Sequence, residues 1–269
     1  MKEVIIIDGS YYCFYRYYAI LNWFKCAKKD EDISNPPENK DFVEKYKKTF
    51  VSKIQEMPKK LKMTNPTIIV AKDCHRKNIW RMELYNDYKK NRVYDDSFMG
   101  GPFFEMAYKN EELFKKAGVN IIFKHGKLEA DDCAALTAKY LIKKYPDINI
   151  KIITSDTDYL QLICPNIELF TLKYKKVNTS KNSSGNPKQD LFCKIVSGDK
   201  SDCIPSVFPK CGPKTALKYW NDQELFKQKL SENPEYQKRY HMNTILINME
   251  HIPIHLQSEF NKKLNSIEI

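Results

Sequence analysis

The sequence predicts an α/β fold, with a mostly parallel central sheet flanked by helices and a smaller helical region after it. Two observations carry this prediction. Short apolar segments rich in Ile and Val recur through the first two thirds of the chain, as is typical of strands buried on both faces of a parallel sheet. Stretches with helical spacing lie between these segments, which is the order of elements that builds such a sheet.

The expected strands are five apolar segments separated by polar or turn-forming residues. They cover residues 4–7, 67–71, 119–123, 148–154 and 167–172. The expected helices cover residues 11–23, 42–61, 105–117 and about 129–145. A loop rich in Ser, Asn, Gly and Pro at residues 178–187 divides the chain. We therefore expect an α/β core over residues 1–177 and a helical region over residues 188–269.

The composition indicates a basic globular protein. The 269 residues include 45 Lys and Arg against 34 Asp and Glu, which gives a net charge of +11 and a pI of about 9.1. Such an excess predicts contact with a polyanion, either nucleic acid or an anionic membrane surface. No run of about 18 apolar residues is present, so no membrane span is expected. The N-terminus also lacks the layout of a signal peptide.

The eight cysteines are scattered, and none forms a C-x-x-C pair. This pattern argues against a structural zinc site and predicts reduced thiols. We expect an intracellular, reducing compartment, whether cytoplasm, nucleus or a viral replication site.

Acidic residues follow the ends of four expected strands. Because the carboxyl ends of parallel strands meet at one edge of a sheet, these side chains are expected to converge. Each alone is equally well explained as a turn residue or a helix cap. Gathered together, they would repel one another unless cations neutralised them, which predicts hard divalent ions held by oxygen ligands. The residues in question are Asp8, Asp73, Glu129, Asp131, Asp132, Asp156 and Asp158.

A pair of divalent ions suits one reaction in particular. Two such ions stabilise both attack and departure at a phosphodiester, and the positive charge of the remaining chain would hold a phosphate backbone. The residues themselves therefore predict a metal-dependent nuclease.

Five motifs occur in a fixed order along the chain. They are Ile7-Asp8-Gly9, Trp80-Arg81 through Tyr88-Lys89-Lys90-Asn91-Arg92, Leu128-Glu129-Ala130-Asp131-Asp132, Thr154-Ser155-Asp156-Thr157-Asp158, and Ser197-Gly198-Asp199-Lys200-Ser201-Asp202 with its continuation to Leu217. With these motifs the chain resembles the 5′ nuclease superfamily, which comprises flap endonucleases, phage 5′–3′ exonucleases and the 5′ nuclease domain of DNA polymerase I. The resemblance implies a PIN-like core and a structure-specific 5′ nuclease that hydrolyses DNA near 5′ ends and junctions.

The resemblance also implies a metal site and the residues that form it. Two Mg²⁺ ions, replaceable by Mn²⁺, are expected, with Asp131, Asp156 and Asp158 as direct ligands. Lys89 and Arg81 are expected to stabilise the scissile phosphate, and Asp156 and Asp158 are expected to be essential for catalysis. The implied metal-binding acids are Asp8, Asp73, Glu129, Asp131, Asp132, Asp156, Asp158, Asp199 and Asp202.

Two segments are implied to bind nucleic acid. Residues 74–104 correspond to the helical arch of the family, which holds a single strand. Residues 199–220 correspond to its helix–two-turn–helix element, which holds duplex and often a K⁺ ion. The implied contacts are Arg81, Lys89, Lys90 and Arg92 in the arch, and Gly212, Lys214 and Thr215 at the turn.

Two other functions stay open at this point. A PIN-type ribonuclease shares the sheet with fewer acids, and a junction-binding protein without catalysis would use the basic surface alone. The Gly198–Leu217 block argues against the first, and the full acid set argues against the second. The expected partners are DNA with 5′ flaps, nicks or free 5′ ends, and RNA–DNA hybrids are a further candidate. No clamp-binding motif of the form Q-x-x-aliphatic-x-x-aromatic-aromatic is visible.

Overall fold

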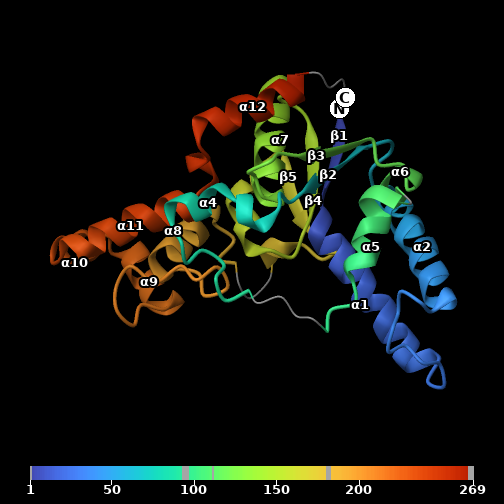
Figure 1. The fold of residues 1–269 in the computed structure, drawn as a ribbon. Helices are drawn as coiled ribbons and strands as arrows, with labels where there is room; N and C mark the ends of the chain where they lie inside the picture. Colours follow the sequence, from blue (N-terminus) through green and yellow to red (C-terminus); the bar gives the residue numbers. More distant parts are fainter. Residues whose placement is uncertain (1, 93–96, 111, 180–182, 266–269) are drawn as a thin grey trace.

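A single parallel sheet forms the centre of the molecule (Figure 1). The computed structural model describes residues 2–92, 97–110, 112–179 and 183–265. The sheet has the strand order β3-β2-β1-β4-β5, and every neighbouring pair is parallel. The strands are β1 (Glu3–Asp8), β2 (Thr67–Lys72), β3 (Ile121–Lys124), β4 (Asn149–Ile153) and β5 (Ile167–Phe170). The predicted fold class and all five expected strands are confirmed.

Helices cover both faces of this sheet, as the apolar strands require. Along β1, Val4 and Ile6 face one apolar cluster, whereas Ile5 and Ile7 face the other. The first cluster lies under α7 (Ala130–Lys144) and α12 (Ile254–Asn265). The second lies under α1 (Gly9–Ala27), α2 (Lys40–Gln55), α3 (Met57–Lys60), α5 (Gly101–Glu105) and α6 (Leu113–Lys116). The sheet is therefore the middle layer of three.

Two of the expected helices are interrupted. The helix expected over residues 42–61 divides into α2 and α3, and Pro58 stands in the first turn of α3, where its missing N–H does no harm. The helix expected over residues 105–117 divides into the end of α5, a π-helical turn η2 (Met106–Asn110) and α6. Glu112, which precedes α6, adopts a left-handed φ of 48°, so a continuous α-helix cannot pass through it.

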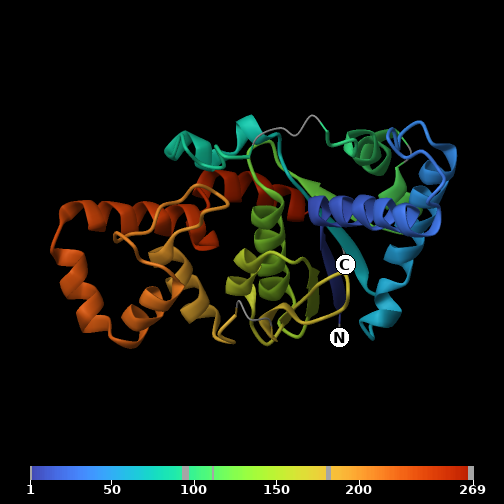
Figure 2. The same ribbon diagram turned by 90° about the horizontal axis from the view of Figure 1, so that it is seen from below.

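The remaining long helices form a lobe at one end of the molecule, opposite α1 and α2 (Figures 1 and 2). They pack around Val196, Phe208 and Phe226. The members of the lobe are α8 (Pro187–Ser197), α9 (Pro213–Asn221), α10 (Gln223–Ser231) and α11 (Pro234–Ile247). Helix α12 leaves the lobe and buries Phe260 against Phe123 of the sheet. The proposed division at residues 178–187 stays a prediction.

The segment expected to form the arch connects the core to the lobe. It contains η1 (Arg76–Asn78) and α4 (Trp80–Leu84), and residues 93–96 lie outside the described part of the chain. Ile79 and Tyr88 share one apolar cluster with Ile195 of the lobe. Three further short helices are η3 (Thr157–Leu162), η4 (Val177–Thr179) and η5 (Met249–His251).

Two expectations about the environment of the chain can be compared with the structure. Among the described residues, no helix is both long enough and apolar enough to cross a membrane. All eight cysteines are free thiols.

Candidate metal centre

The ends of β1 and β2 place two carboxylates side by side. Asp8 ends β1 and caps α1, since its Oδ1 accepts a hydrogen bond from the amide of Tyr11 at 3.0 Å. Asp73 follows β2 and accepts from the hydroxyl of Ser10 at 2.5 Å and from the amide of Ala130 at 2.8 Å. Burial, and then the charge of Asp73, raise the pKa of Asp8 to about 7. A cation at this point would lower that pKa again.

A buried ion pair fixes the start of α7. Glu129 caps the helix, and Asp132 accepts from the Glu129 amide at 3.2 Å, which forms a capping box. Both Asp132 oxygens bind the guanidinium of Arg81, at 2.7 and 2.8 Å, and Trp80 Nε1 donates to the same carboxylate at 2.9 Å. Asp132 therefore has no oxygen left facing the cleft.

Arg81 lies inside the molecule and not at its surface. Its side chain is 2% exposed. Besides Asp132, it donates to Glu129 at 2.8 Å and to the carbonyl of Leu246 at 2.8 Å. The sequence predicted that Arg81 contacts a phosphate, and this buried position does not support that prediction. To reach a phosphate, Arg81 would have to break its hydrogen bonds to Asp132, Glu129 and Leu246. In this structure Arg81 positions the acids of α7.

The first turn of α7 carries two acids, Asp131 and Asp132. Asp132 pairs with Arg81, whereas Asp131 has no ion pair among the described residues. Its Oδ1 accepts only from the amide of Asp132, at 2.7 Å, among the hydrogen bonds of the described chain. Burial, followed by the charges of Asp132 and Glu129, raises the pKa of Asp131 well above its usual range. Asp131 is therefore the residue of this motif that gains most from a metal ion.

Lys89 and Arg92 pair with acids from two other segments. The ammonium of Lys89 contacts Glu129 and lies 3.7 Å from Asp202 Oδ2, and Arg92 donates to Asp202 Oδ1 at 2.7 Å. Burial lowers the pKa of Lys89, but the charges of Glu129 and Asp202 outweigh it and raise that pKa. Tyr88 also approaches Glu129, at 3.0 Å. These contacts fasten the arch segment to the acidic cluster.

The end of β4 and the end of α8 supply the other acids. Asp156 caps η3 by accepting from the amide of Asp158 at 2.9 Å, and burial raises the pKa of Asp156. Asp158 and Asp199 share the ammonium of Lys194, which lies 2.8 Å from Asp199. Burial opposes ionisation of Asp199, but Lys194 and Ser201 lower its pKa to about 2.

Two residues that hold these acids were missed by the reasoning from sequence. Lys194 stands four residues before the Gly198 of its motif, and no pattern marks it out from other helical lysines. Gly198 has a φ of 71°, and a Cβ there would lie 2.4 Å from the carbonyl oxygen of Ile204. The motif therefore requires glycine, which lets Asp199 and Ile204 exchange two backbone hydrogen bonds of 2.9 and 2.8 Å. The position of Gly198 directly before Asp199, a predicted metal ligand, was the only indication in the sequence that the backbone there needs glycine.

The nine acids fall into two sets. Five pair with a cation of the protein: Glu129, Asp132, Asp158, Asp199 and Asp202. Within the described residues, no ion pair involves the other four: Asp8, Asp73, Asp131 and Asp156. All of the donor atoms are carboxylate oxygens, as Mg²⁺ and Mn²⁺ prefer, and oxygens of Asp158, Asp199 and Asp202 lie within 4.8 Å of one another. The donor set fits divalent cations.

The other residues predicted to bind nucleic acid lie at the surface. Lys90 is exposed and pairs with Asp87 at 3.0 Å. Gly212 caps α9 with extended backbone and open space where a Cβ would stand, so no local strain requires glycine there. Lys214 and Thr215 are exposed in the first turn of α9.

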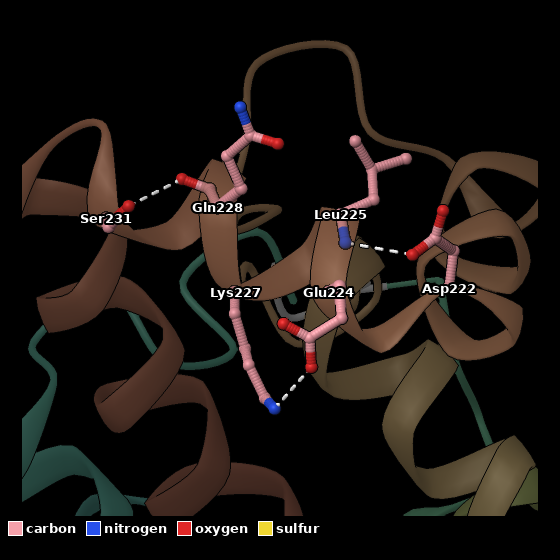
Figure 3. A pocket seen from close by; sticks show the side chains of 6 residues that line it. All are labelled: Asp222, Glu224, Leu225, Lys227, Gln228 and Ser231. Atoms are coloured by element: carbon pink, nitrogen blue, oxygen red, sulfur yellow. Dashed lines mark hydrogen bonds and ion pairs between the residues drawn. The ribbon is translucent and has the colours of Figure 1, made fainter.

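Two surface hollows differ in their relation to the acids. A hollow of about 220 Å³ is lined by Asp73 and Ser10 together with Phe104, Tyr108 and other residues, so it borders the predicted centre. A larger hollow of about 670 Å³ lies on α10, where Lys227 pairs with Glu224 (Figure 3). None of the six residues that line the larger hollow belongs to the predicted site.

Comparison with known proteins agrees with this arrangement. Residues 3–189 match the family described as 5′-3′ exonuclease, N-terminal resolvase-like domain. The 5′-3′ exonuclease of Buchnera aphidicola subsp. Acyrthosiphon pisum is 33% identical over 220 residues, which cover 80% of this chain and 69% of that protein. Ribonuclease H of Enterobacteria phage T4 is 28% identical over 278 residues, covering 93% and 87% of the two chains.

Solved structures share the fold. The T5 D15 protein, co-crystallised with metal ions, superposes with a TM-score of 0.69 at 17% identity, and each chain is covered completely. T5 5′-exonuclease with bound zinc gives a TM-score of 0.67 at 16% identity over 99% of each chain. The fold and the acidic centre thus define a metal-dependent nuclease of the α/β class. The chain belongs to the 5′-3′ exonuclease family, and the 5′ nuclease function predicted from its motifs is confirmed.

Asp8 provides a test of the electrostatics of the centre. Its pKa lies above the unfolded value of 3.8, so the native state retains a proton that the unfolded state loses, and stability falls as the pH rises from about 4 to 7. In the presence of a chelator, Asp8→Asn keeps the cap and should be more stable than the wild type by up to about 4 kcal/mol at pH 8. The gain should vanish near pH 4. Chemical unfolding across this pH range measures it.

Asp41→Asn is the control for this experiment, because Asp41 occupies the first turn of α2 on the surface. It should change the free energy of unfolding by no more than about 0.5 kcal/mol at any pH. Equal stability of Asp8→Asn and the wild type at pH 8 would contradict the raised pKa of Asp8.

Proposed function

We propose that this protein is an Mg²⁺-dependent, structure-specific 5′ nuclease that hydrolyses DNA phosphodiesters near 5′ ends, flaps and nicks. The single observation that carries the proposal is a group of four carboxylates, following the ends of the strands, that have no cation of the protein within the described chain: Asp8, Asp73, Asp131 and Asp156. Carboxylates in such a place repel one another until a divalent cation joins them. The family to which the chain belongs supports the reaction type.

The proposed metal ligands come from five segments. Asp8, Asp73, Asp131 and Asp156 would hold one ion, and Asp158 and Asp199 would contribute to a second, with Mn²⁺ as a substitute for Mg²⁺. When bound, two such ions supply an activated water and stabilise the leaving oxygen. Glu129 and Asp132 stay paired with Arg81, and Asp202 stays paired with Arg92, so these three acids orient the neighbouring segments. No side-chain nucleophile is required.

Lys89 is the cation that we assign to the scissile phosphate. Its positive charge acts on Asp131 and on Asp156, which places it beside the proposed metal ligands. Its backbone is fixed, because its amide donates to the carbonyl of Asp202 at 2.9 Å. An ammonium held there stabilises negative charge that develops on the phosphate. Arg92, which is half exposed, and Lys90 extend the positive surface along the arch segment.

The turn before α9 is the proposed anchor for duplex. Pro213 occupies the first turn of α9, and the exposed amides of Lys214 and Thr215 follow it. Free amides and the helix dipole favour a phosphate at such a start, and open space beside Gly212 admits a close approach. A K⁺ ion at this turn is part of the proposal.

The substrate class is inferred from the relatives. They include 5′-3′ exonucleases, a ribonuclease H and the T5 D15 flap endonuclease in complex with DNA. DNA with 5′ flaps or nicks is therefore the proposed substrate. RNA in RNA–DNA hybrids is a second candidate, favoured by the similarity to ribonuclease H of phage T4 over 93% of the chain. The free thiols support a reducing intracellular compartment.

The first test is metal dependence. EDTA should abolish cleavage of a 5′-labelled flap, since the carboxylates alone cannot generate the nucleophile. Added Mg²⁺ should restore cleavage. Asp156→Asn should lose cleavage while it retains affinity for the flap, and a nicked, a blunt and a single-stranded substrate would define the specificity. Full activity in EDTA would contradict the proposal.

The second test concerns the duplex anchor. Lys214→Ala should weaken binding to flap and nicked duplexes and reduce the salt slope of binding by about one. It should leave binding to single strands nearly unchanged. Affinity measured against salt concentration, with Asp156→Asn as the background, separates these effects. Lys227→Ala removes the same charge from a lysine of α10 that already pairs with Glu224, and it is the control. Equal losses on duplex and single strand would mean that the turn is not a duplex anchor.

A further inference from the structure

Lys194 places a positive charge among the acids of the proposed second metal. It lies near the end of α8, and its ammonium pairs with Asp158 and lies 2.8 Å from Asp199 Oδ2. All three side chains are largely buried, with exposed fractions of 20% for Lys194, 15% for Asp158 and 14% for Asp199. One positive charge of the protein is therefore shared by the two carboxylates.

The two acids that Lys194 contacts are also the two proposed to contribute to the second divalent ion. Asp158, Asp199 and Asp202 each offer one oxygen within 4.8 Å of the others, and the ammonium contacts two of these three residues. The second oxygen of Asp199 is engaged elsewhere, since it accepts from the amide and the hydroxyl of Ser201 at 2.8 and 2.6 Å. Two cations cannot share these oxygens, because they would repel at contact distance. The ammonium and a divalent ion are thus alternative occupants.

Lys194 can leave this position without disturbing the helix that carries it. Asn186 caps α8 by accepting from the amide of Lys188 at 3.1 Å, and Ile195 and Val196 anchor the helix in two apolar clusters. The lysine side chain is a flexible stem with a single charged end. Arg81 differs, because four separate contacts fix its guanidinium. Of the two cations, Lys194 is the one suited to exchange.

We propose that Lys194 is an internal competitor for the second metal position: its ammonium neutralises Asp158 and Asp199 until a divalent ion displaces it. The proposal rests on the metal-dependent function proposed above and deepens it. It makes the second ion the weaker one in the free protein, since binding must first break the contacts of Lys194. Lys194 is accordingly a positioning residue that sets the metal concentration at which the centre is complete.

Calorimetric titration with Mn²⁺, without nucleic acid, tests the proposal. Lys194→Met keeps the length of the side chain and removes its charge. It should lower the dissociation constant of the weaker site about ten- to a hundredfold, the equivalent of one charged hydrogen bond. The tighter site should change little. Lys188→Met removes the same charge from an exposed position of α8 and should behave as the wild type.

Two further variants of Lys194 separate the effect of its charge on Mn²⁺ binding from a failure of the Met variant to fold. Lys194→Gln should also tighten the weaker site, and it replaces Lys194→Met if that variant does not fold. Lys194→Arg retains the charge with more donors, so the weaker site should bind Mn²⁺ no more tightly than in the wild type. Unchanged or weakened Mn²⁺ binding in both neutral variants would overturn the role of Lys194 alone. Absence of Mn²⁺ binding in the wild type would instead overturn the metal-dependent function, and the inference with it.

Discussion

The ion pair between Arg81 and Asp132 joins three segments that lie far apart in the sequence. Arg81 belongs to the arch segment, Asp132 starts α7, and the carbonyl of Leu246 in α11 accepts a third hydrogen bond from the same guanidinium. Because these groups are buried, removal of one would leave charges without partners, which is far costlier than the loss of a surface pair. The position of the lobe relative to the sheet, and the direction in which Asp131 points its charge, both depend on this contact.

Charge balance explains how a basic protein can keep nine acids at one edge of its sheet. Arg81, Lys89, Arg92 and Lys194 pair with five of the acids, and these pairs fasten the arch segment and α8 to the core. The remaining acids have no such partners in the described chain, and desolvation together with the charge of neighbouring acids raises the pKa of Asp8 and of Asp131. A group that binds a proton too readily for its type also binds a divalent cation well. Arg81 and Arg92 thus hold acids that orient the structure, whereas Asp158 and Asp199 both pair with a lysine and belong to the proposed metal ligands.

The sequence was sufficient for the fold class and the five strands, whereas the metal-binding roles of the acids stay predictions and the buried contacts of the basic residues were not predicted. Continuous runs such as Ile5–Ile7 predict buried parallel strands, and the rule that strand ends share an edge brings Asp8, Asp73 and Asp156 together. A basic residue in a nuclease motif predicts a contact with phosphate. Arg81 instead donates to the carbonyl of Leu246, 165 residues away, and no local sequence pattern indicates such a distant partner. Lys194 was missed for a different reason: Asp199 lies only five residues further on, but nothing in the sequence distinguishes this lysine from other helical lysines. The interruption near residue 112 depends on a left-handed backbone that a helical pattern cannot indicate.

A double-mutant cycle on Arg81 and Asp132 measures how strongly their buried ion pair stabilises the fold. The free energy of unfolding is measured in a chelator for the wild type, Arg81→Met, Asp132→Leu and the double variant, with exposed Lys90→Met as the surface reference. Each single change should cost about 3–5 kcal/mol, and the double variant should cost clearly less than the sum, since neither buried charge is then left without its partner. Losses within about 0.5 kcal/mol, as expected for Lys90→Met, would contradict this prediction.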